Sequence, residues 1–363
     1  MGKTITFNLE TILKEHCEKE GNYIYLKKNK KLLLTKKKSR RSTFTFPTKV
    51  TIKPSTIGLI VGEGYVDKKR FVFANSNEMI IKQLINFFQK FGITPNYMLE
   101  ISVKNVEKTF MKTALRKWQK ITKNRINKTR IRKEFNNTTE KGTITLSYYN
   151  TCFSIILARI IKKTKKMVEN DTKLAISYLK GILAAEGNVN IKKKTKCVYM
   201  VRISEKKKSE REHYKRCLRT TGIKIYCKDM PSVSKKEGVR RGWKTKHGRA
   251  GCVIISRWKN FVKILMNDLL ELHREKEESF LNGFKQNLYT RLFLDFEQYI
   301  NKEFTLKDME KCFGLTNKPI QRADYMIQRA YLTKDFRKEP YRYRLTEKYL
   351  LLYNKIKQYP IFQ

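Results

Sequence analysis

One short stretch is written twice in this chain: TIGLIVGEG at residues 56–64 and LKGILAAEG at residues 179–187. Small residues recur at matching offsets, a glutamate follows them, and a glycine follows the glutamate. Glu63 and Glu186 therefore hold the same position in the two copies. Both stretches are apolar on nearly every face, which is typical of buried helices. The repeat indicates two related units, each of which supplies one acid to a shared place.

The small residues of each stretch lie on one face of the predicted helix. Gly58 and Gly62 are four residues apart in the first copy. Gly181 and Ala185 repeat this spacing in the second copy. Glycine costs about 1 kcal/mol relative to alanine inside a helix, so a face made of glycine needs a structural reason. We expect the two helices to pack side by side at unusually short range and to bring the two glutamates together.

Two acids at the ends of paired helices are unfavourable for stability. A carboxylate at a helix C-terminus opposes the helix dipole by about 0.3–1 kcal/mol, and two nearby anions repel each other. A divalent cation offsets both effects: Mg²⁺ prefers a few carboxylates together with water and phosphate oxygens, and it can activate water for phosphodiester hydrolysis. The repeat therefore points to a site for Mg²⁺, or Mn²⁺ in its place, rather than to two unrelated helices that end in Glu-Gly.

The composition favours a nucleic-acid partner. The 363 residues include 81 Lys and Arg against 33 Asp and Glu, a formal net charge of +48, which is what a polyanion-binding surface needs. No run approaches the ~20 apolar residues of a membrane span, and the N-terminus lacks a signal-peptide core. We expect an intracellular protein of the cytoplasm, nucleoid or an organelle matrix, not secreted and without a membrane partner. The seven cysteines lack zinc-site spacing and are expected to be reduced.

Each copy of the repeat is followed by the same predicted order of elements: helix, strand, strand, helix, strand, strand, helix. We place the first half-domain at residues 55–168 and the second at 169–287. The first repeat helix is expected to be capped by Ser55 or Thr56 and closed by Gly64 in a left-handed conformation. The other elements expected in the first half are strands at 65–66, 70–74, 97–103 and 143–149 and helices at 78–91, 107–120 and 152–166. Those expected in the second half are helices at 174–185, 205–219 and 261–280, a hairpin at 188–203 and strands at 224–228 and 252–256.

The chain on either side of the half-domains differs from them in pattern. Residues 1–54 form a basic N-terminal extension with a short helix at 8–19, and its cationic part at 27–41 is expected to be a solvated arm. Residues 288–363 are predicted to hold three helices and a hairpin, which is a winged-helix layout. These elements are helices at 288–300, 306–313 and 319–330 and strands at 331–333 and 341–345. The alternative is a helical tail that packs on the preceding domain.

The third helix of this layout is expected to bury one apolar stripe and to leave its basic residues for DNA. The stripe consists of Ile320, Ala323, Ile327 and Ala330. The candidate DNA contacts are Arg322 and Arg329 on the helix, for the groove, and Arg342 and Arg344 on the hairpin, for phosphate.

These features resemble the two-motif LAGLIDADG homing endonucleases over residues 55–287, with 56–64 and 179–187 as the paired motifs. The resemblance implies an α+β fold in which two pseudo-symmetric αββαββα halves pack through their motif helices and spread a saddle-shaped sheet over the DNA major groove. It also implies a monomer whose last motif acids, Glu63 and Glu186, bind the catalytic metal ions, each active centre cutting one strand. Glutamate replaces the family's usual aspartate, and Val61 and Ala184 replace an acid that is not a metal ligand.

The function implied is a site-specific double-strand DNA endonuclease that hydrolyses phosphodiester bonds with divalent metal ions at two adjacent active centres. Neither end of the chain carries intein splicing residues, so an intein is not expected. We expect a free-standing or intron-encoded enzyme that acts in intron homing. Two alternatives stay open on the same scaffold: an RNA maturase with intron RNA as its partner, and a DNA-binding regulator that does not cleave. A degenerate enzyme is expected to lose one motif acid, and both acids are present here.

The resemblance also points to side chains around the two acids. Solvent-facing residues of the strands are the candidate contacts to phosphate or guanine edges. They are Lys68, Lys69 and Arg70 in the first half and Lys192, Lys194, Lys196 and Arg202 in the second. Polar residues at 75–77 and 204–206 lie where the family often orders active-site water. The family also places a basic residue near each metal site, for which the candidates are Lys162 or Lys163 and His273 or Arg274.

Overall fold

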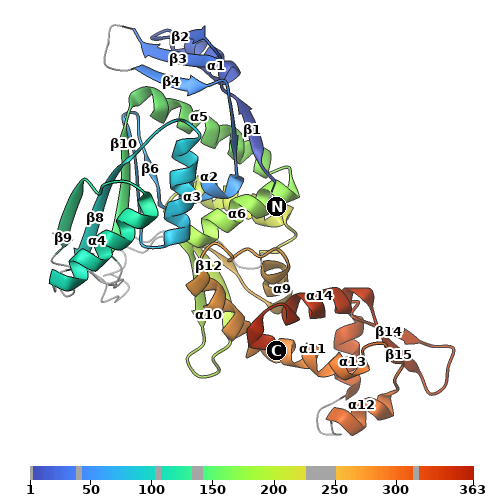
Figure 1. Ribbon diagram of the computed structural model, residues 1–363. Coiled ribbons are helices and arrows are strands. Elements are labelled where there is room, and N and C mark those ends of the chain that lie inside the picture. The colour runs from blue at the N-terminus through green and yellow to red at the C-terminus, as the bar shows by residue number, and fades with distance from the viewer. Residues whose placement is uncertain (1–2, 38–42, 103–107, 133–141, 226–250, 314–318) are drawn as a thin grey trace, which may run out of the picture. The chain divides into compact units, whose positions relative to one another are not determined.

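The computed structural model describes residues 3–37, 43–102, 108–132, 142–225, 251–313 and 319–363 (Figure 1). The described chain is a mixture of helices and strands, an α+β structure. It forms two compact units: the first holds Met1–Asn188, Ile203–Val253 and Leu269–Arg274, and the second holds Val189–Arg202, Ile254–Asp268 and Glu275–Gln363. Both repeat helices and both glutamates belong to the first unit.

The two repeat helices are α2 (Pro54–Glu63) and α6 (Thr172–Glu186), as predicted. Nearly every side chain of both helices is buried, in keeping with their apolar sequences. α6 begins at a capped end, where the Asp171 carboxylate accepts the backbone N–H of Leu174 at 2.9 Å. Such a cap satisfies a backbone donor that has no partner within the helix.

The ends of α2 differ from those predicted. Ser55 and Thr56 lie inside the helix, and their hydroxyls accept hydrogen bonds from Gln83 Nε2 at 2.9 Å, so neither is the cap. Pro54 starts the helix instead, where its missing N–H costs no hydrogen bond. Gly64 has a φ of −79° and a ψ of 148°, so the predicted left-handed end is wrong. The extended conformation sends the chain directly into the next strand.

The first half-domain contains a five-stranded sheet. Its strand order is β6-β7-β10-β8-β9, with β9 parallel to β8 and the other pairs antiparallel. The strands are β6 (Tyr65–Val66), β7 (Arg70–Asn75), β8 (Asn96–Ser102), β9 (Lys128–Arg132) and β10 (Thr143–Tyr149). The helices of this half are α3 (Glu78–Gln89), α4 (Lys108–Thr122) and α5 (Thr151–Val168). β9 was not predicted, because its alternating basic residues lack an apolar face.

The two faces of this sheet have opposite character. One face carries Phe71 and Phe73 of β7 and Leu146 of β10, all fully buried. Phe71 contacts Phe88 of α3, with ring centroids 5.1 Å apart. By strand register, Arg70 and Tyr149 lie opposite each other on the other face, where both are exposed. One face therefore builds the core, and the other is largely open to solvent, with Thr145 and Glu100 buried on it.

Residues 3–37 and 43–52 are folded, so the predicted solvated arm is wrong for residues 27–37, and the rest of it lies outside the described residues. The elements are β1 (Ile5–Asn8), α1 (Leu9–Glu20), β2 (Tyr23–Lys28), β3 (Lys31–Lys36), β4 (Thr43–Pro47) and β5 (Lys49–Ile52). β1 pairs with β5, and β2, β3 and β4 form a meander. Leu32 and Leu34 of β3 are fully buried. The many lysines of this region lie on the exposed faces of its strands and at its turns. Their charge made the region resemble a solvated arm, so its strands were not predicted.

The second copy follows the predicted order where it is described. Its strands β11 (Gly187–Ile191), β12 (Val198–Ser204) and β13 (Cys252–Ile255) form a sheet in the order β11-β12-β13. Its helices are α7 (Lys208–Thr220), α9 (Trp258–Met266) and α10 (Arg274–Lys285). The strand predicted at 224–228 is not seen at residues 224–225, and its remaining residues lie outside the described part of the chain.

The C-terminal segment contains the predicted helices and hairpin and one further helix. Its elements are α11 (Leu288–Leu294), a 3₁₀ turn (Asp295–Tyr299), α12 (Leu306–Phe313), α13 (Pro319–Ile327), β14 (Leu332–Asp335), β15 (Arg342–Leu345) and α14 (Glu347–Lys357). The helix predicted at 288–300 ends early, at Leu294. The predicted stripe of α13 is wrong in register: Ala323 and Met326 are buried, whereas Ile320 is 57% exposed. α14 was not predicted.

Five cysteines are free thiols, in line with the expectation of reduced cysteines: Cys17, Cys152, Cys197, Cys217 and Cys252. Burial raises the pKa of Cys152 to about 11 and that of Cys217 to about 12. Cys197 is only half-buried. None of the helices in the described ranges is long and apolar enough to cross a membrane.

Alkylation at pH 8 is expected to label Cys197 well before Cys152 and Cys217, because the thiolate is the reactive form and the two buried thiols stay protonated. Site-resolved mass spectrometry of the native and the denatured protein measures this order. Since folding raises both pKa values, the stability that these thiols contribute is present below pH 9.0, the ordinary thiol value, and is lost as the pH rises toward about 12. Rapid labelling of Cys217 in the native protein would contradict this burial.

Candidate active site

The repeat helices α2 and α6 meet backbone to backbone at their glycines (Figure 1). A Cβ atom placed on Gly58 would lie 2.3 Å from the Tyr178 carbonyl oxygen. One placed on Gly181 would lie 2.0 Å from the Ser55 carbonyl oxygen and 2.7 Å from the Leu59 nitrogen. Real Cβ atoms do not approach backbone atoms this closely, so the spacing requires glycine at these positions.

The same contact brings the two acids near each other. A Cβ atom on Gly62 would lie 2.5 Å from Ala185 Cβ and 3.4 Å from Glu186 Cγ. The Glu186 side chain therefore starts beside the backbone of the residue that precedes Glu63. Both glutamates are half-buried at the last position of their helices. The four predicted interface residues Gly58, Gly62, Gly181 and Ala185 all lie where the two helices touch.

Asn75, at the end of β7, orients the first acid. Its side-chain amide donates a hydrogen bond from Nδ2 to Glu63 Oε2. Its Oδ1 accepts the backbone N–H of Asn77 at 2.7 Å, which fixes which end of the amide faces the glutamate. Asn77 in turn caps α3 by accepting from Met79 N at 3.0 Å. Of the polar run at 75–77, Asn75 therefore contacts Glu63, and the ordering of active-site water by this run stays a prediction.

The corresponding position in the second copy has a different side chain. Glu205 follows β12 as Asn75 ends β7, and its Oε1 accepts the backbone N–H of Lys207 at 2.8 Å. Tyr214 of α7 is fully buried. Burial is the main cause that raises the pKa of Tyr214, and the negative charges of Glu205, Glu210 and Glu186 add to it. Tyr214 is therefore near enough to Glu186, Glu205 and Glu210 to feel all three charges.

The donor set at the helix ends fits a divalent metal. Carboxylate oxygens are the ligands that Mg²⁺ and Mn²⁺ take in proteins, and Glu63 and Glu186 supply them from adjacent helix ends. Within the residues that the structure describes, no group of three or more His, Cys, Asp or Glu side chains is arranged to hold a metal ion. The remaining ligands of a metal at this pair would have to be water and substrate oxygens, which Mg²⁺ accepts readily.

Arg70 is held by contacts with side chains of its own sheet. Its Nε donates to Asp67 Oδ2 at 3.3 Å, and its guanidinium carbon lies 5.3 Å from the Tyr65 ring centroid. Hydrogen bonding with Tyr149 and Tyr65 raises its pKa. Lys68 and Lys69 are exposed in the turn between β6 and β7. The open sheet face therefore presents the Arg70 guanidinium in a held position.

The far edge of the same face carries basic residues that sequence reasoning missed. By parallel register, Lys128 pairs with Met98 and Arg130 with Glu100, so both basic side chains lie on the same face as Arg70. Both are exposed. The alternation in Lys128-Thr129-Arg130 is the signal that could have identified an edge strand, since an edge strand with polar alternation needs no apolar residues.

The other predicted DNA contacts are in the second unit. Lys192, Lys194 and Lys196 are exposed in the turn between β11 and β12, and Arg202 of β12 is half-buried. The turn itself is ordered: Lys196 N donates to the Lys192 carbonyl at 2.8 Å. These lysines are available to solvent.

The predicted basic residues of the C-terminal segment divide into two kinds. Arg322 pairs with Asp295 at 3.0 Å, and the Arg329 guanidinium lies 3.3 Å from the Tyr325 ring centroid, so both contact their own unit. Arg342 and Arg344 of β15 are exposed, as expected for a phosphate contact. Arg344 also pairs with a glutamate, Glu303, at 2.9 Å.

Of the basic residues considered near the acids, Lys163 is committed elsewhere. Its Nζ donates to Glu15 Oε1 of α1 at 2.9 Å, which ties α5 to the N-terminal helix. Lys162 is exposed, and Arg274 is exposed at the start of α10.

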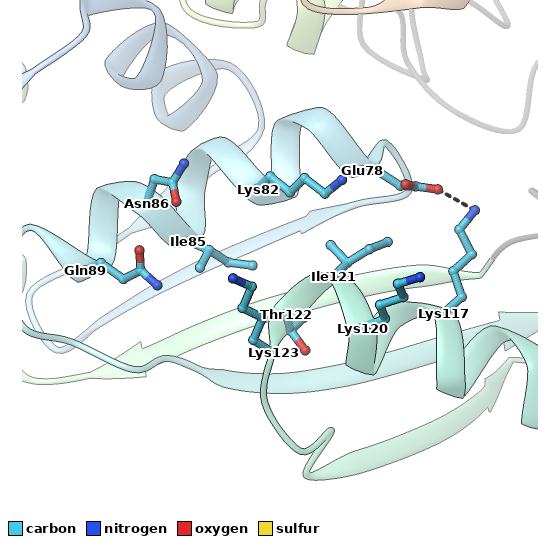
Figure 2. Close-up of a pocket in the computed structure, with 10 residues that line it drawn as sticks. All are labelled: Glu78, Lys82, Ile85, Asn86, Gln89, Lys117, Lys120, Ile121, Thr122 and Lys123. Atoms are coloured by element: carbon cyan, nitrogen blue, oxygen red, sulfur yellow. Dashed lines mark ion pairs between the residues drawn. The ribbon is translucent and has the colours of Figure 1, made fainter.

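A cleft of about 600 Å³ lies between α3 and α4 (Figure 2). Its floor contains Ile85 and Ile121, and Glu78 and Lys117 form an ion pair at one end. The remaining lining residues are Lys82, Asn86, Gln89, Lys120, Thr122 and Lys123. Neither repeat glutamate lines this cleft. This cleft is thus a mainly basic groove apart from the acid pair.

Comparisons with known proteins give limited likeness. Neither a family model nor a curated protein sequence matches the chain. Among solved structures, the chain is similar to I-DmoI in complex with DNA and Ca, at 16% identity over 58% of this chain and 85% of that chain, with a TM-score of 0.31. It is also similar to I-DmoI in complex with DNA and Mn, and to mesophilic variants of the homing endonuclease I-DmoI. Each of these two matches has 16% identity over 60% of this chain and 94% of that chain, with a TM-score of 0.33. Overlaps of this size establish neither the fold nor the activity of this chain.

Proposed function

We propose that this chain is a site-specific, metal-dependent DNA endonuclease of the LAGLIDADG homing type, with Glu63 and Glu186 as its paired catalytic acids. The observation that carries the proposal is the contact between α2 and α6, where backbone meets backbone at Gly58 and Gly181. Two helices held this closely for the sake of packing alone have no need to end in like charges. A divalent cation bound between the two carboxylates and a phosphodiester would offset their repulsion and explain why both are present.

Glu63 and Glu186 would hold the metal ions, with water and phosphate oxygens completing the coordination. A bound Mg²⁺ or Mn²⁺ supplies charge to stabilise the leaving oxygen and lowers the pKa of water. Asn75 holds the Glu63 carboxylate through Nδ2, so it limits the directions in which that acid can turn. In the second half the corresponding position after the strand holds Glu205, a carboxylate instead of an amide. The two proposed active centres therefore share one acid type and differ at this position.

The open face of the five-stranded sheet is the proposed DNA contact of the first half. Arg70, Lys128 and Arg130 place positive charge along its exposed side. The lysines at 192–196 and Arg202 take the same role in the second half, and residues 288–363 add a winged-helix DNA-binding domain. We propose a monomer, because one chain supplies both acids. The net charge of +48 supports binding to a duplex through phosphate neutralisation.

DNA cleavage is expected to require a divalent metal, and loss of activity on metal removal is expected to be reversed when the metal is added back. The full-length protein, incubated with a randomised or genomic DNA library in Mg²⁺, is expected to cut at a limited set of related sequences. EDTA should stop the reaction and excess Mg²⁺ should restore it, because carboxylate sites exchange Mg²⁺ freely. Sequencing of the cut ends identifies the target. Cutting that persists in EDTA, or that shows no sequence preference, would contradict the proposal.

An RNA maturase or a non-cleaving DNA-binding regulator is the second candidate. The large excess of positive charge serves RNA as well as DNA, since the electrostatic part of binding does not distinguish them. The same library experiment separates the candidates. Mg²⁺-independent, tight binding to structured RNA without any DNA cleavage favours the maturase, and sequence-selective DNA binding without cleavage favours the regulator. The presence of both motif acids favours the endonuclease.

A further inference from the structure

The tip of the β14–β15 hairpin carries two exposed aromatic side chains. Phe336 is 73% exposed and Tyr341 is 41% exposed. Their rings meet nearly edge to face, with centroids 5.9 Å apart and planes at 66°. A single exposed ring is common on protein surfaces, whereas two rings held against each other at a hairpin tip form an ordered apolar surface.

A cation and a turn hold these rings in place. Lys334 Nζ lies 4.9 Å from the Phe336 ring centroid and 3.8 Å from the Tyr341 ring centroid. The Asp335 carboxylate accepts the backbone N–H of Arg337 at 3.0 Å, which shapes the start of the loop. The strands below the tip pair in antiparallel register. The rings are therefore positioned before any partner arrives, which lowers the entropy that binding would otherwise cost.

The charge around the rings is mainly positive. Arg337 and Lys338 flank Phe336, and Arg342 and Arg344 follow Tyr341 along β15, all four being exposed. The neighbouring acids include Asp335, Glu339, Asp324 and Asp308, the last of which lies near enough to Arg342 for their charges to interact. Glu303 pairs with Lys338 at 3.5 Å and with Arg344 at 2.9 Å. Lys334 lies over the rings. A partner for this tip must offer negative charge and a flat apolar face within a few ångströms of each other.

Nucleic acid meets both requirements. Each nucleotide joins a phosphate to a planar base, and aromatic side chains stack on bases with little regard to sequence. Apolar side chains at the tips of DNA-binding elements also enter between base steps and unstack them. An acidic protein surface would satisfy the arginines but would leave the rings without a matching flat partner.

We propose that the hairpin tip is a base-stacking element, in which Phe336 stacks on an unstacked base of DNA with Tyr341 behind it, while Arg342 binds the adjacent phosphate. The inference rests on the proposed DNA-binding function. It adds a contact whose strength depends on how easily a DNA base step unstacks. The proposed sheet contacts depend instead on the hydrogen-bonding groups at the base edges.

The test uses the full-length chain and two DNA probes of the same sequence. One is a paired duplex, and the other has 2-aminopurine opposite an abasic position, so that its base is free to leave the stack. Phe336→Ala is expected to weaken binding to the second probe about 10-fold, since a stacked base contributes ~1–3 kcal/mol. The fluorescence change of 2-aminopurine on binding should be lost with it. Phe336→Trp should keep both the affinity and the fluorescence change.

Leu351 of α14 supplies the matched control, because it is an apolar side chain of the same unit and is 58% exposed. Leu351→Ala should bind both probes as the wild type does. The salt dependence separates stacking from phosphate contact: Phe336→Ala should leave the slope of log Kobs against log salt unchanged, whereas Arg342→Ala should reduce it by about 1. Thermal unfolding is expected to be unchanged in Phe336→Ala, since this ring packs into no core.

Three results would overturn the inference. In the first, Phe336→Ala binds the abasic probe as tightly as the wild type, and in the second, Leu351→Ala weakens binding equally. In the third, the wild type binds vesicles of anionic lipid through Phe336 and fails to bind the abasic probe. Failure of the wild type to bind either DNA would end both this inference and the proposed function. Cleavage is not measured, so a chain that binds DNA without cutting it leaves the stacking result intact.

Discussion

Replacing Gly181 by alanine is expected to destabilise the first unit by about 3 kcal/mol or more, a large overpacking effect. The new methyl group would lie 2.0 Å from the Ser55 carbonyl oxygen and 2.7 Å from the Leu59 nitrogen. Both are backbone atoms of α2, so no side chain can rotate away and the helices must separate. Alanine gains only about 1 kcal/mol in helix propensity, which does not offset the clash. Thermal and denaturant unfolding of the full-length protein measure the loss.

Gly62 provides a control in which the same change can be rescued. Alanine at Gly62 would meet the Ala185 Cβ at 2.5 Å, which is a side-chain atom. Gly62→Ala alone should destabilise the protein, and adding Ala185→Gly should return the double variant close to wild type, because one methyl group moves from one helix to the other. Equal stability of Gly181→Ala and the wild type would show that α2 and α6 do not approach as described.

The second large effect concerns the acids themselves. Glu63→Gln and Glu186→Gln are each expected to reduce double-strand cleavage at least 1000-fold, since a bound metal contributes several kcal/mol of transition-state stabilisation that an amide cannot retain. DNA binding should persist, because the amide is nearly the same size and one negative charge is removed from a surface that faces phosphate. Gel-based cleavage and binding assays on one target measure both quantities.

A carboxylate outside the pair gives the matched control. Glu271 pairs with Lys180 of α6 at 2.8 Å, so Glu271→Gln alters a charge near the same helix without touching the helix ends. Its cleavage rate should stay close to wild type. The proposed function would be wrong if both motif variants cut DNA at the wild-type rate. Loss of binding together with cleavage would instead indicate that the acids serve folding.

The parts of the fold set by local pattern could be predicted from the sequence. β10 occupies residues 143–149 as predicted, because its apolar and polar residues alternate between clear boundaries. α12 at 306–313 is likewise as predicted. The close approach of α2 and α6 followed from the glycine spacing, because two bare helix faces can only be explained by another backbone. The acids were found through the same repeat.

The parts set by tertiary pairing could not be predicted in this way. β9 is held by its parallel pairing with β8 rather than by a core of its own, so its sequence looks like a basic loop. The N-terminal meander was hidden by lysines at the ends of its strands and in the turn between β2 and β3. The left-handed end predicted for α2 was wrong because Gly64 is extended and leads directly into β6. The prediction of which face of α13 is buried was wrong because several choices of apolar stripe were equally consistent with its sequence.

The N-terminal fold also has a consequence for protein engineering. It packs on α5 through the Phe44 and Phe153 rings, whose centroids lie 5.7 Å apart, and Asn150 Nδ2 donates to the Thr43 carbonyl at 3.0 Å. Only Lys53 separates β5 from α2, the helix that ends in Glu63. A transplantable module cut at the repeat would expose the apolar side of α5 and loosen the start of an acid-bearing helix. The smallest portable fragment therefore begins at β1, and fusion partners belong before it.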